Sequence, residues 1–166
     1  MLSKWLSHSK PFVCDSTSLF DQNTFYAALE NDLRHCQREL VIESPFITAS
    51  RINVLLPIFE KMCRRNVKII INTRNPIEHE GDYVRQAQEA VTILQEMGAT
   101  VLYTTKHHRK LAIIDRYVTY EGSLNILSFS DSCEIMRRIV SDVVANDLYK
   151  YLGLHRYNKE TNHGQF

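Results

Sequence analysis

Hydrophobic and polar residues alternate along the chain with two periods, and each period predicts a type of secondary structure. Apolar residues three or four apart indicate amphipathic helices over 21–39, 50–65, 83–97 and 142–152. Continuous apolar or β-branched runs indicate buried strands at 40–46 and 67–74. Shorter runs indicate strands at 100–104, 110–115, 117–122 and 135–140, and residues 75–81 are expected to form a loop.

Three residues should mark the helix boundaries. Asp21 is a plausible N-cap, Pro57 should begin or kink the regular part of its helix, and Gly98 should close the third helix. Helices and strands alternate through the first hundred residues, and strands cluster after them. This order predicts an α/β fold, with a mixed, mostly parallel β-sheet flanked by helices on both faces.

Size and composition are those of an ordinary globular protein. The 166 residues favour a single domain, with 44% hydrophobic and 23% charged residues. The net charge of +1 excludes a global field that draws the protein to nucleic acid or membrane, so an anionic partner needs a local patch.

The cysteines and the apolar runs favour a soluble cytoplasmic protein. Cys14, Cys36, Cys63 and Cys133 lie far apart without a CxxC pair, which argues against a zinc site and a disulfide framework. No apolar run has the length of a signal peptide or of a membrane span.

One stretch, from residue 107 to 125, contains polar residues that burial does not explain. It follows the pattern His-x-Lys-x4-Asp-x6-Gly-Ser-x-Asn. Six matches at about one in twenty each would arise by chance roughly once in 10⁸ starting positions, so the motif is specific. The fixed residues are His108, Lys110, Asp115, Gly122, Ser123 and Asn125.

These residue types suit the cleavage of a phosphodiester, which needs a nucleophile, a proton for the leaving oxygen and cations around the phosphoryl group. A neutral His108 imidazole can attack phosphorus. Lys110, two residues along a strand, should point to the same side and meet the phosphate charge. Ser123 and Asn125 share a side by the same rule and can donate hydrogen bonds. No metal-ligand cluster is present, and this chemistry requires no cofactor.

The motif resembles the HKD motif of the phospholipase D superfamily, whose members cleave or transfer phosphodiesters. Glu134 follows at about the position where family members carry a glutamate that orients the histidine. The resemblance covers residues 10–152 of a single domain with the phospholipase D-like sandwich fold, and leaves 156–166 as a flexible tail. It implies a phosphohistidine intermediate. Asp115 is grouped with the catalytic residues, although in the family it more often plays a buried structural role.

A single motif raises the question of the second histidine, because one imidazole cannot be nucleophile and acid in the same step. The simplest completion is a twofold homodimer that places two copies of His108 around one phosphate. The resemblance implies the same assembly, since single-motif members typically dimerise.

The substrate is open among several classes of phosphodiester. A compact chain without a membrane anchor most resembles the bacterial endonuclease branch, so nucleic acid, with DNA as the first candidate, is the expected partner. A phospholipid phosphodiesterase is the enzymatic alternative. A non-catalytic nucleic-acid-binding or dimerisation module of a helicase or restriction assembly is the third possibility.

The two residues on either side of His108 have competing interpretations. His107 is an ordinary surface or core histidine in the simpler one, and a metal ligand or second acid in the other. Arg109 either lies in solvent or contributes to substrate binding by steering the phosphate. Lys106, Arg109, Lys110 and Arg116 give the motif region a local excess of positive charge.

Overall fold

The structure is a computed structural model that describes residues 15–129 and 131–154. Within these ranges one seven-stranded sheet carries four α-helices and a short 3-10 helix, η1 (Pro76–Glu78). The strands are β1 (Ser16–Asp21), β2 (Glu39–Glu43), β3 (Lys68–Thr73), β4 (Thr100–Tyr103), β5 (Leu111–Ile114), β6 (Val118–Gly122) and β7 (Ile135–Val140). The helices are α1 (Phe25–His35), α2 (Ala49–Arg64), α3 (Asp82–Glu96) and α4 (Asp142–Tyr151). The expected start of the core at Lys10 and the expected tail lie outside the described residues.

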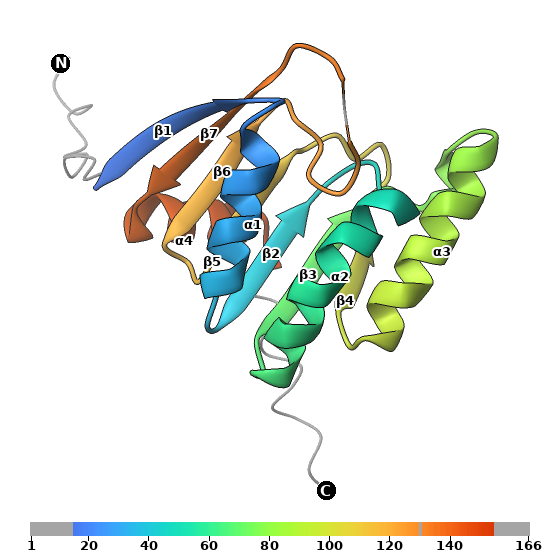
Figure 1. Cartoon of the computed structure of the whole chain (residues 1–166), viewed down its shortest axis with the longest axis horizontal. Coiled ribbons are helices and arrows are strands. Elements are labelled where there is room, and N and C mark those ends of the chain that lie inside the picture. Colours follow the sequence, from blue (N-terminus) through green and yellow to red (C-terminus); the bar gives the residue numbers. More distant parts are fainter. Residues whose placement is uncertain (1–14, 130, 155–166) are drawn as a thin grey trace, which may run out of the picture.

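The sheet is mixed, but the prediction that it is mostly parallel was wrong. Its order is β1-β7-β6-β5-β2-β3-β4. Only the β2–β3 and β3–β4 pairs are parallel, and the other four pairs are antiparallel. Parallel neighbours need a crossover, which α2 and α3 supply. After β4 the connections carry no helix until β7 has ended, so the later strands pair as antiparallel neighbours (Figure 1).

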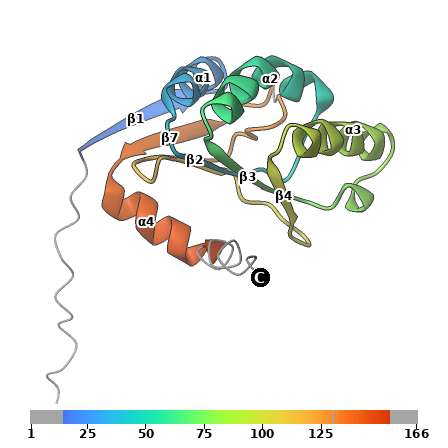
Figure 2. The same ribbon diagram turned by 90° about the horizontal axis from the view of Figure 1, so that it is seen from below.

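Helices cover both faces of the sheet, as predicted, but unequally. Figure 2 shows α1, α2 and α3 on one side and α4 on the other. The larger core lies under the three helices and includes Leu29, Leu55 and Leu94 from α1, α2 and α3. The smaller core packs Ala145 and Tyr149 of α4 against apolar residues of the central strands.

Strand β1 was not predicted. Its side chains are mostly exposed, and it pairs only with β7 at the edge of the sheet. The segment STSLFD therefore has no continuous apolar face that would identify it as a strand. Its pairing depends on β7, which follows more than a hundred residues later.

The first helix is shorter than its hydrophobic pattern indicated. It begins at Phe25, after Thr24 at the N-cap position, and ends at His35. The Asp21 carboxylate accepts hydrogen bonds from the backbone N–H groups of Asn23 and Thr24, both at 3.0 Å, and so stabilises the turn before the helix. Asp21 is thus not the N-cap that the sequence predicted.

The next boundaries agree better with the pattern. Helix α2 starts after Thr48, whose hydroxyl accepts from the Arg51 N–H, and runs through Pro57 rather than beginning there. Gly98, directly after the C-cap of α3, has φ +96°, a conformation that favours glycine.

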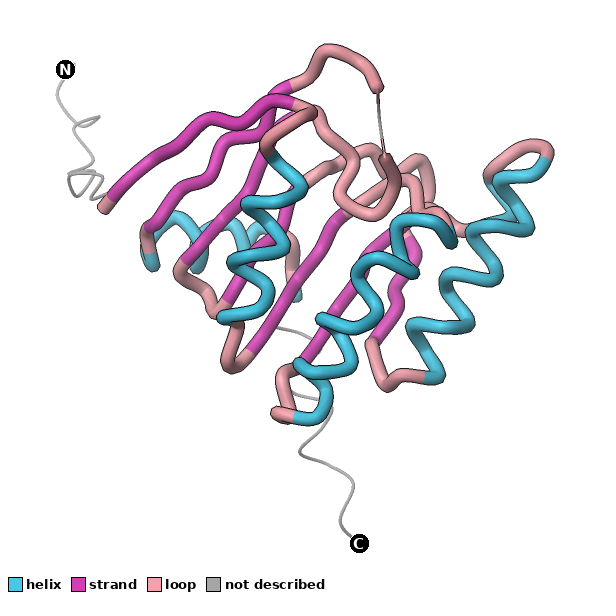
Figure 3. The backbone as a smooth tube through the Cα atoms, in the orientation of Figure 1, coloured by secondary structure: helices cyan, strands magenta, loops and turns pink. Residues whose placement is uncertain are grey.

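The connections after β2, β3 and β6 gather along one end of the sheet (Figure 3). Two of them are in direct contact, because the Thr48 N–H donates to the Leu127 carbonyl at 2.9 Å and the Leu127 N–H donates to the Ser44 hydroxyl at 3.2 Å. The residues preceding β5 and following β6 reach the same end, which brings both halves of the motif together.

Candidate active site

His108, which is exposed, and Lys110, which is partly buried, form the centre of the site. The Lys110 Nζ lies 2.9 Å from His108 Nδ1 and donates to the His108 carbonyl at 3.1 Å. An ammonium group can only donate, so Nδ1 accepts in this state. Both residues precede β5, which begins at Leu111. The side chains are neighbours as predicted, although the segment that carries them is not a strand.

The charges around Lys110 come from distant parts of the sequence. Partial burial lowers the pKa of the Lys110 ammonium, the Glu134 carboxylate opposes this shift, and the Arg74 guanidinium adds to it. Glu134 therefore lies within electrostatic range of the site, and its carboxylate also accepts a short hydrogen bond from Ser132. Its orientation of His108 stays a prediction. Arg74, which follows β3, is a site residue that was not predicted from the sequence.

Gly122 places the second half of the motif directly beside Lys110. Its N–H donates to the Lys110 carbonyl at 3.3 Å. A Cβ at this position would lie 2.3 Å from the Ile135 carbonyl oxygen, so only glycine allows β6 to approach β7 this closely. The Ser123 hydroxyl both donates to the Ile135 carbonyl, at 3.3 Å, and accepts from the Ile135 N–H, at 3.2 Å.

Asn125 lies in a loop that two helices hold in place. Its carbonyl accepts from the Tyr26 hydroxyl at 3.2 Å, and the next carbonyl, of Ile126, accepts from Arg51 Nε at 3.3 Å. Arg51 is fully buried and forms an ion pair with Glu30 at 2.6 Å. The Asn125 Oδ1 is buried and has no hydrogen-bond partner among the described residues. The buried Oδ1 can only accept, so a bond from Asn125 to a phosphoryl oxygen would have to come from its NH₂ group.

Asp115 lies at the other end of β5 from Lys110. The four strand residues between them separate the two by about 16 Å at the usual rise per residue. Its carboxylate accepts from the backbone N–H groups of Gln37, Arg38 and Glu39 at 2.9, 2.7 and 3.0 Å. Burial raises the pKa of Asp115, but these donors outweigh it and keep the pKa below its ordinary value. The structure thus separates Asp115 from the rest of the motif.

The two residues that flank His108 both approach one buried carboxylate, Glu43. Arg109 Nε donates to Glu43 Oε2 at 2.5 Å, and His107 Nε2 lies 3.5 Å from the same oxygen. His107 is buried, as the simpler interpretation expected. Burial lowers the pKa of its imidazole, Glu43 opposes this, and neighbouring cations add to it. The Arg109 guanidinium is thus bound to Glu43. A contact between Arg109 and the substrate stays a prediction.

Glu43 was not among the residues predicted from the sequence, although the sequence carries a signal for it. Glu43 ends the apolar strand β2, and Asn72 and Arg74 stand at the end of the apolar strand β3. The carboxyl ends of neighbouring parallel strands meet at one end of a sheet, where α/β proteins commonly place binding residues. The polar residues at the carboxyl ends of the two buried strands were therefore candidates for one common site.

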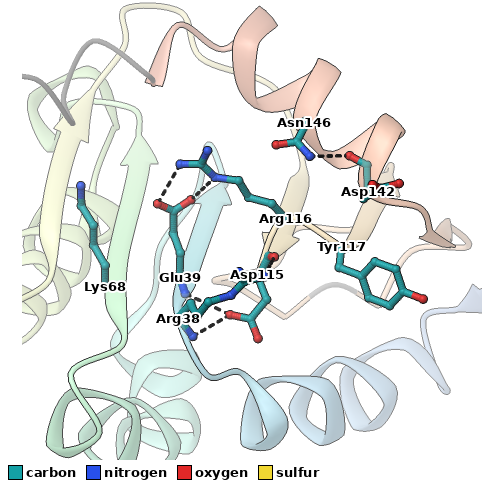
Figure 4. A pocket seen from close by; sticks show the side chains of 8 residues that line it. All are labelled: Arg38, Glu39, Lys68, Asp115, Arg116, Tyr117, Asp142 and Asn146. Atoms are coloured by element: carbon teal, nitrogen blue, oxygen red, sulfur yellow. Dashed lines mark hydrogen bonds and ion pairs between the residues drawn. The ribbon is translucent and has the colours of Figure 1, made fainter.

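A pocket of about 530 Å³ lies elsewhere, beside the start of β2, the β5–β6 turn and α4 (Figure 4). Basic and acidic side chains line this pocket in equal number. Among them, Arg116 forms an ion pair with Glu39 at 3.1 Å. Arg116 also stacks over the Tyr149 ring at 3.8 Å. Since Asp115 lines this pocket, it opens at the end of β5 remote from His108. Arg116 therefore does not belong to the positive region around the motif.

Two further properties bear on the kind of site. Among the described residues, no group of three or more histidine, cysteine or acidic side chains is arranged to hold a metal ion. No helix in the described ranges is long and apolar enough to cross a membrane.

The chain is similar to proteins of known structure and family. Residues 29–153 match the family described as "Cardiolipin synthase, PLD-like domain". No curated protein matches the chain. Among solved structures, NucT from Helicobacter pylori has a TM-score of 0.66 at 17% identity, and the match covers 82% of this chain and 92% of NucT.

Two other structures share the fold. Nuc from Salmonella typhimurium, described as a phospholipase D family member, has a TM-score of 0.64 at 14% identity, with 90% of this chain and 97% of Nuc covered. TrmBL2, an archaeal chromatin protein described with a novel mode of DNA binding, has a TM-score of 0.57 at 13% identity, with 92% of this chain and 55% of TrmBL2 covered.

Proposed function

The chain belongs to the phospholipase D-like domain family, a family of phosphodiesterases, and we propose that it is a nuclease that works without a metal cofactor. The observation that carries this proposal is the contact between His108 and Lys110 at an exposed position beside Gly122 and Ser123. The contact combines a nucleophile, a cation and hydrogen-bond donors, which are the groups that attack on a phosphodiester needs.

In the proposed reaction a His108 imidazole nitrogen attacks phosphorus, forming a P–N bond while the bond to the leaving oxygen breaks. A second, protonated imidazole gives its proton to that oxygen. Water then attacks the phosphohistidine, the P–N bond breaks, and the second imidazole takes a proton from the water. Lys110 and the NH₂ group of Asn125 stabilise the phosphoryl oxygens, and Ser123 joins them when its hydroxyl proton turns away from the Ile135 carbonyl. In the proposed complex Lys110 turns from His108 Nδ1 to a phosphoryl oxygen, and the Glu134 carboxylate then accepts the N–H of the imidazole nitrogen that does not attack.

The second imidazole is proposed to come from His108 of a second copy of the chain. The site is exposed, so an isologous interface can bring two copies together around one phosphate. Mixing wild-type chains with an excess of His108→Ala chains should then suppress activity beyond simple dilution, because each mixed dimer lacks one of the two imidazoles. A loss that only matches dilution would contradict the shared site. Sedimentation of the mixture at assay concentration verifies that dimers are present.

Nucleic acid is the proposed substrate because two structures with nuclease names, NucT and Nuc, share the fold over nearly their whole length. DNA is the first candidate. Contacts to the phosphate backbone would supply most of the affinity, with weak sequence preference. A helicase or restriction-type partner would then supply specificity.

A phospholipid phosphodiesterase is the second candidate, because the family description names a lipid synthase. A non-catalytic DNA-binding module is the third, because TrmBL2 shares the fold. The completeness of the motif favours an enzyme over this third candidate.

The deciding experiment incubates the protein with plasmid DNA, single-stranded DNA, RNA and phospholipid vesicles in EDTA. Cleavage of nucleic acid that His108→Ala abolishes supports the proposal. Hydrolysis of phospholipid alone would establish the second candidate. Binding of DNA without any hydrolysis would establish the third. Glu39→Gln, a change remote from the motif, controls for nonspecific damage.

A further inference from the structure

The segment that carries His108 has no regular structure of its own. Residues 104–110 form a turn and an irregular stretch between β4 and β5, and His108 is exposed. Lys106 has a positive φ of 55°. Neither a helix nor a strand therefore fixes the nucleophile, and its position depends on tertiary contacts made by its neighbours.

Glu43 supplies the central contact. It is the last residue of β2 and is fully buried. Its Oε2 accepts from Arg109 Nε at 2.5 Å and lies 3.5 Å from His107 Nε2, which has no hydrogen-bond partner among the described residues. One carboxylate thus bonds to the residue after His108 and approaches the residue before it. A bond between charged groups that is shielded from water is stronger than an exposed one.

Glu43 is itself held by the neighbouring parallel strand. Its Oε1 accepts from Asn72 Nδ2 at 2.9 Å. The Asn72 amide also exchanges hydrogen bonds with the Thr104 hydroxyl, at 2.9 and 3.1 Å. Thr104 begins the irregular segment, and Arg74 donates to the His107 carbonyl at 2.9 Å. The ends of β2 and β3 thus contact the segment at its start, at His107 and at Arg109.

We infer that Glu43 is a positioning residue, which fixes His108 for attack through His107 and Arg109 without contacting the phosphate. This inference rests on the proposed function. Glu43 is enclosed by its partners and cannot reach a substrate. Arg109 accordingly acts as the link between Glu43 and the nucleophile. A displacement of a reacting group by about 1 Å can lower a rate by about 10²-fold.

The decisive variant is Glu43→Gln, which keeps the shape of the side chain and removes its charge. The matched control is Glu39→Gln, because Glu39 begins the same strand and pairs with Arg116 at 3.1 Å, remote from the motif. With bis(p-nitrophenyl) phosphate as the substrate, kcat should fall by about 30- to 100-fold in Glu43→Gln, with KM changed less than about threefold. The control should stay within about twofold of wild type.

A second variant keeps the test informative if Glu43→Gln folds poorly. Arg109 is 41% exposed, so Arg109→Gln should fold, and it should lower kcat in the same way. The double variant should be no slower than the slower single variant, because both changes break one contact. Multiplicative losses, or a kcat per folded molecule that stays at the wild-type value in Glu43→Gln, would overturn the inference.

Hydrogen exchange separates this inference from the proposed function. Amides of residues 104–110 should exchange at least about tenfold faster in Glu43→Gln than in wild type or Glu39→Gln. If the wild-type protein hydrolyses no phosphodiester, the proposed function fails, but faster exchange would still show that Glu43 fixes the segment. Unchanged exchange would overturn the positioning role even if the wild-type protein is active.

Discussion

Asp115 can be assigned to the scaffold or to the chemistry by one substitution, Asp115→Asn. The carboxylate accepts three backbone N–H groups from the segment that leads into β2, two of them at Oδ1 and one at Oδ2. Asp115 also has a positive φ of 53°, which asparagine tolerates well. The substitution therefore removes the charge and one acceptor without adding backbone strain.

The expected loss of stability follows from these bonds. An asparagine oxygen can still accept from Arg38 and Glu39, but its NH₂ group faces the Gln37 N–H, so one bond is lost and the others lose their charged acceptor. Hydrogen bonds to charged groups contribute about 1.5–3 kcal/mol. Because the group is partly solvated, we expect a loss at the lower end, about 2 kcal/mol. For a chain of this length the melting temperature should fall by about 4–8 °C.

Urea unfolding at neutral pH measures the change, and Asp21→Asn is the control. Asp21 also accepts two backbone N–H groups, but it is fully exposed, so its substitution should cost much less. The pKa of Asp115 is lowered on folding, so the unfolded state binds more protons as the solution is acidified. The ionised Asp115 carboxylate contributes fully to the free energy of unfolding above the ordinary aspartate pKa of about 3.9. This contribution is lost as the pH falls through the lower pKa of the folded state. The difference between wild type and Asp115→Asn should therefore narrow below about pH 4.

Turnover decides between the two roles. At a temperature well below its melting point, Asp115→Asn should keep kcat within about threefold of wild type, because the carboxylate lies about 16 Å along β5 from Lys110. Unchanged stability together with a tenfold or larger loss of kcat would refute this reasoning and return Asp115 to the catalytic residues.

Three further results are expected. Gly122→Ala should destabilise the fold by about 1–3 kcal/mol in urea unfolding, because its Cβ would meet the Ile135 carbonyl; a variant as stable as wild type would contradict that close approach. Tyr26→Phe should cost about 1 kcal/mol and lower kcat, since it frees the Asn125 carbonyl; unchanged kcat would show that the loop is fixed without Tyr26. Burial lowers the pKa of the His107 imidazole, so below the ordinary histidine pKa of about 6.5 the unfolded state binds more protons and the free energy of unfolding should fall as the pH drops. Between pH 7.5 and 5.5 the urea midpoint should therefore drop less in His107→Gln than in wild type. An equal drop in both proteins would assign the effect to other groups.

The local sequence was sufficient to predict the helices and strands whose own side chains form a continuous apolar face. The runs that became β2 and β3 are almost wholly buried, and the apolar residues of α1, α2 and α3 recur at helical spacing, so both could be recognised without a partner. The motif was recognisable for the same reason, because its residue types and spacing lie within one short stretch.

The tertiary structure alone decided which distant residues meet. The pairing of β1 with β7, the position of Asp115 under residues 37–39, and the approach of Glu43 to Arg109 join segments 66 or more residues apart. Periodicity describes which face of an element is buried, but it does not specify the neighbouring strand or the direction of pairing. Those depend on the free energy of packing the whole sheet, so the motif was visible in the sequence while the contacts that fix its nucleophile were not.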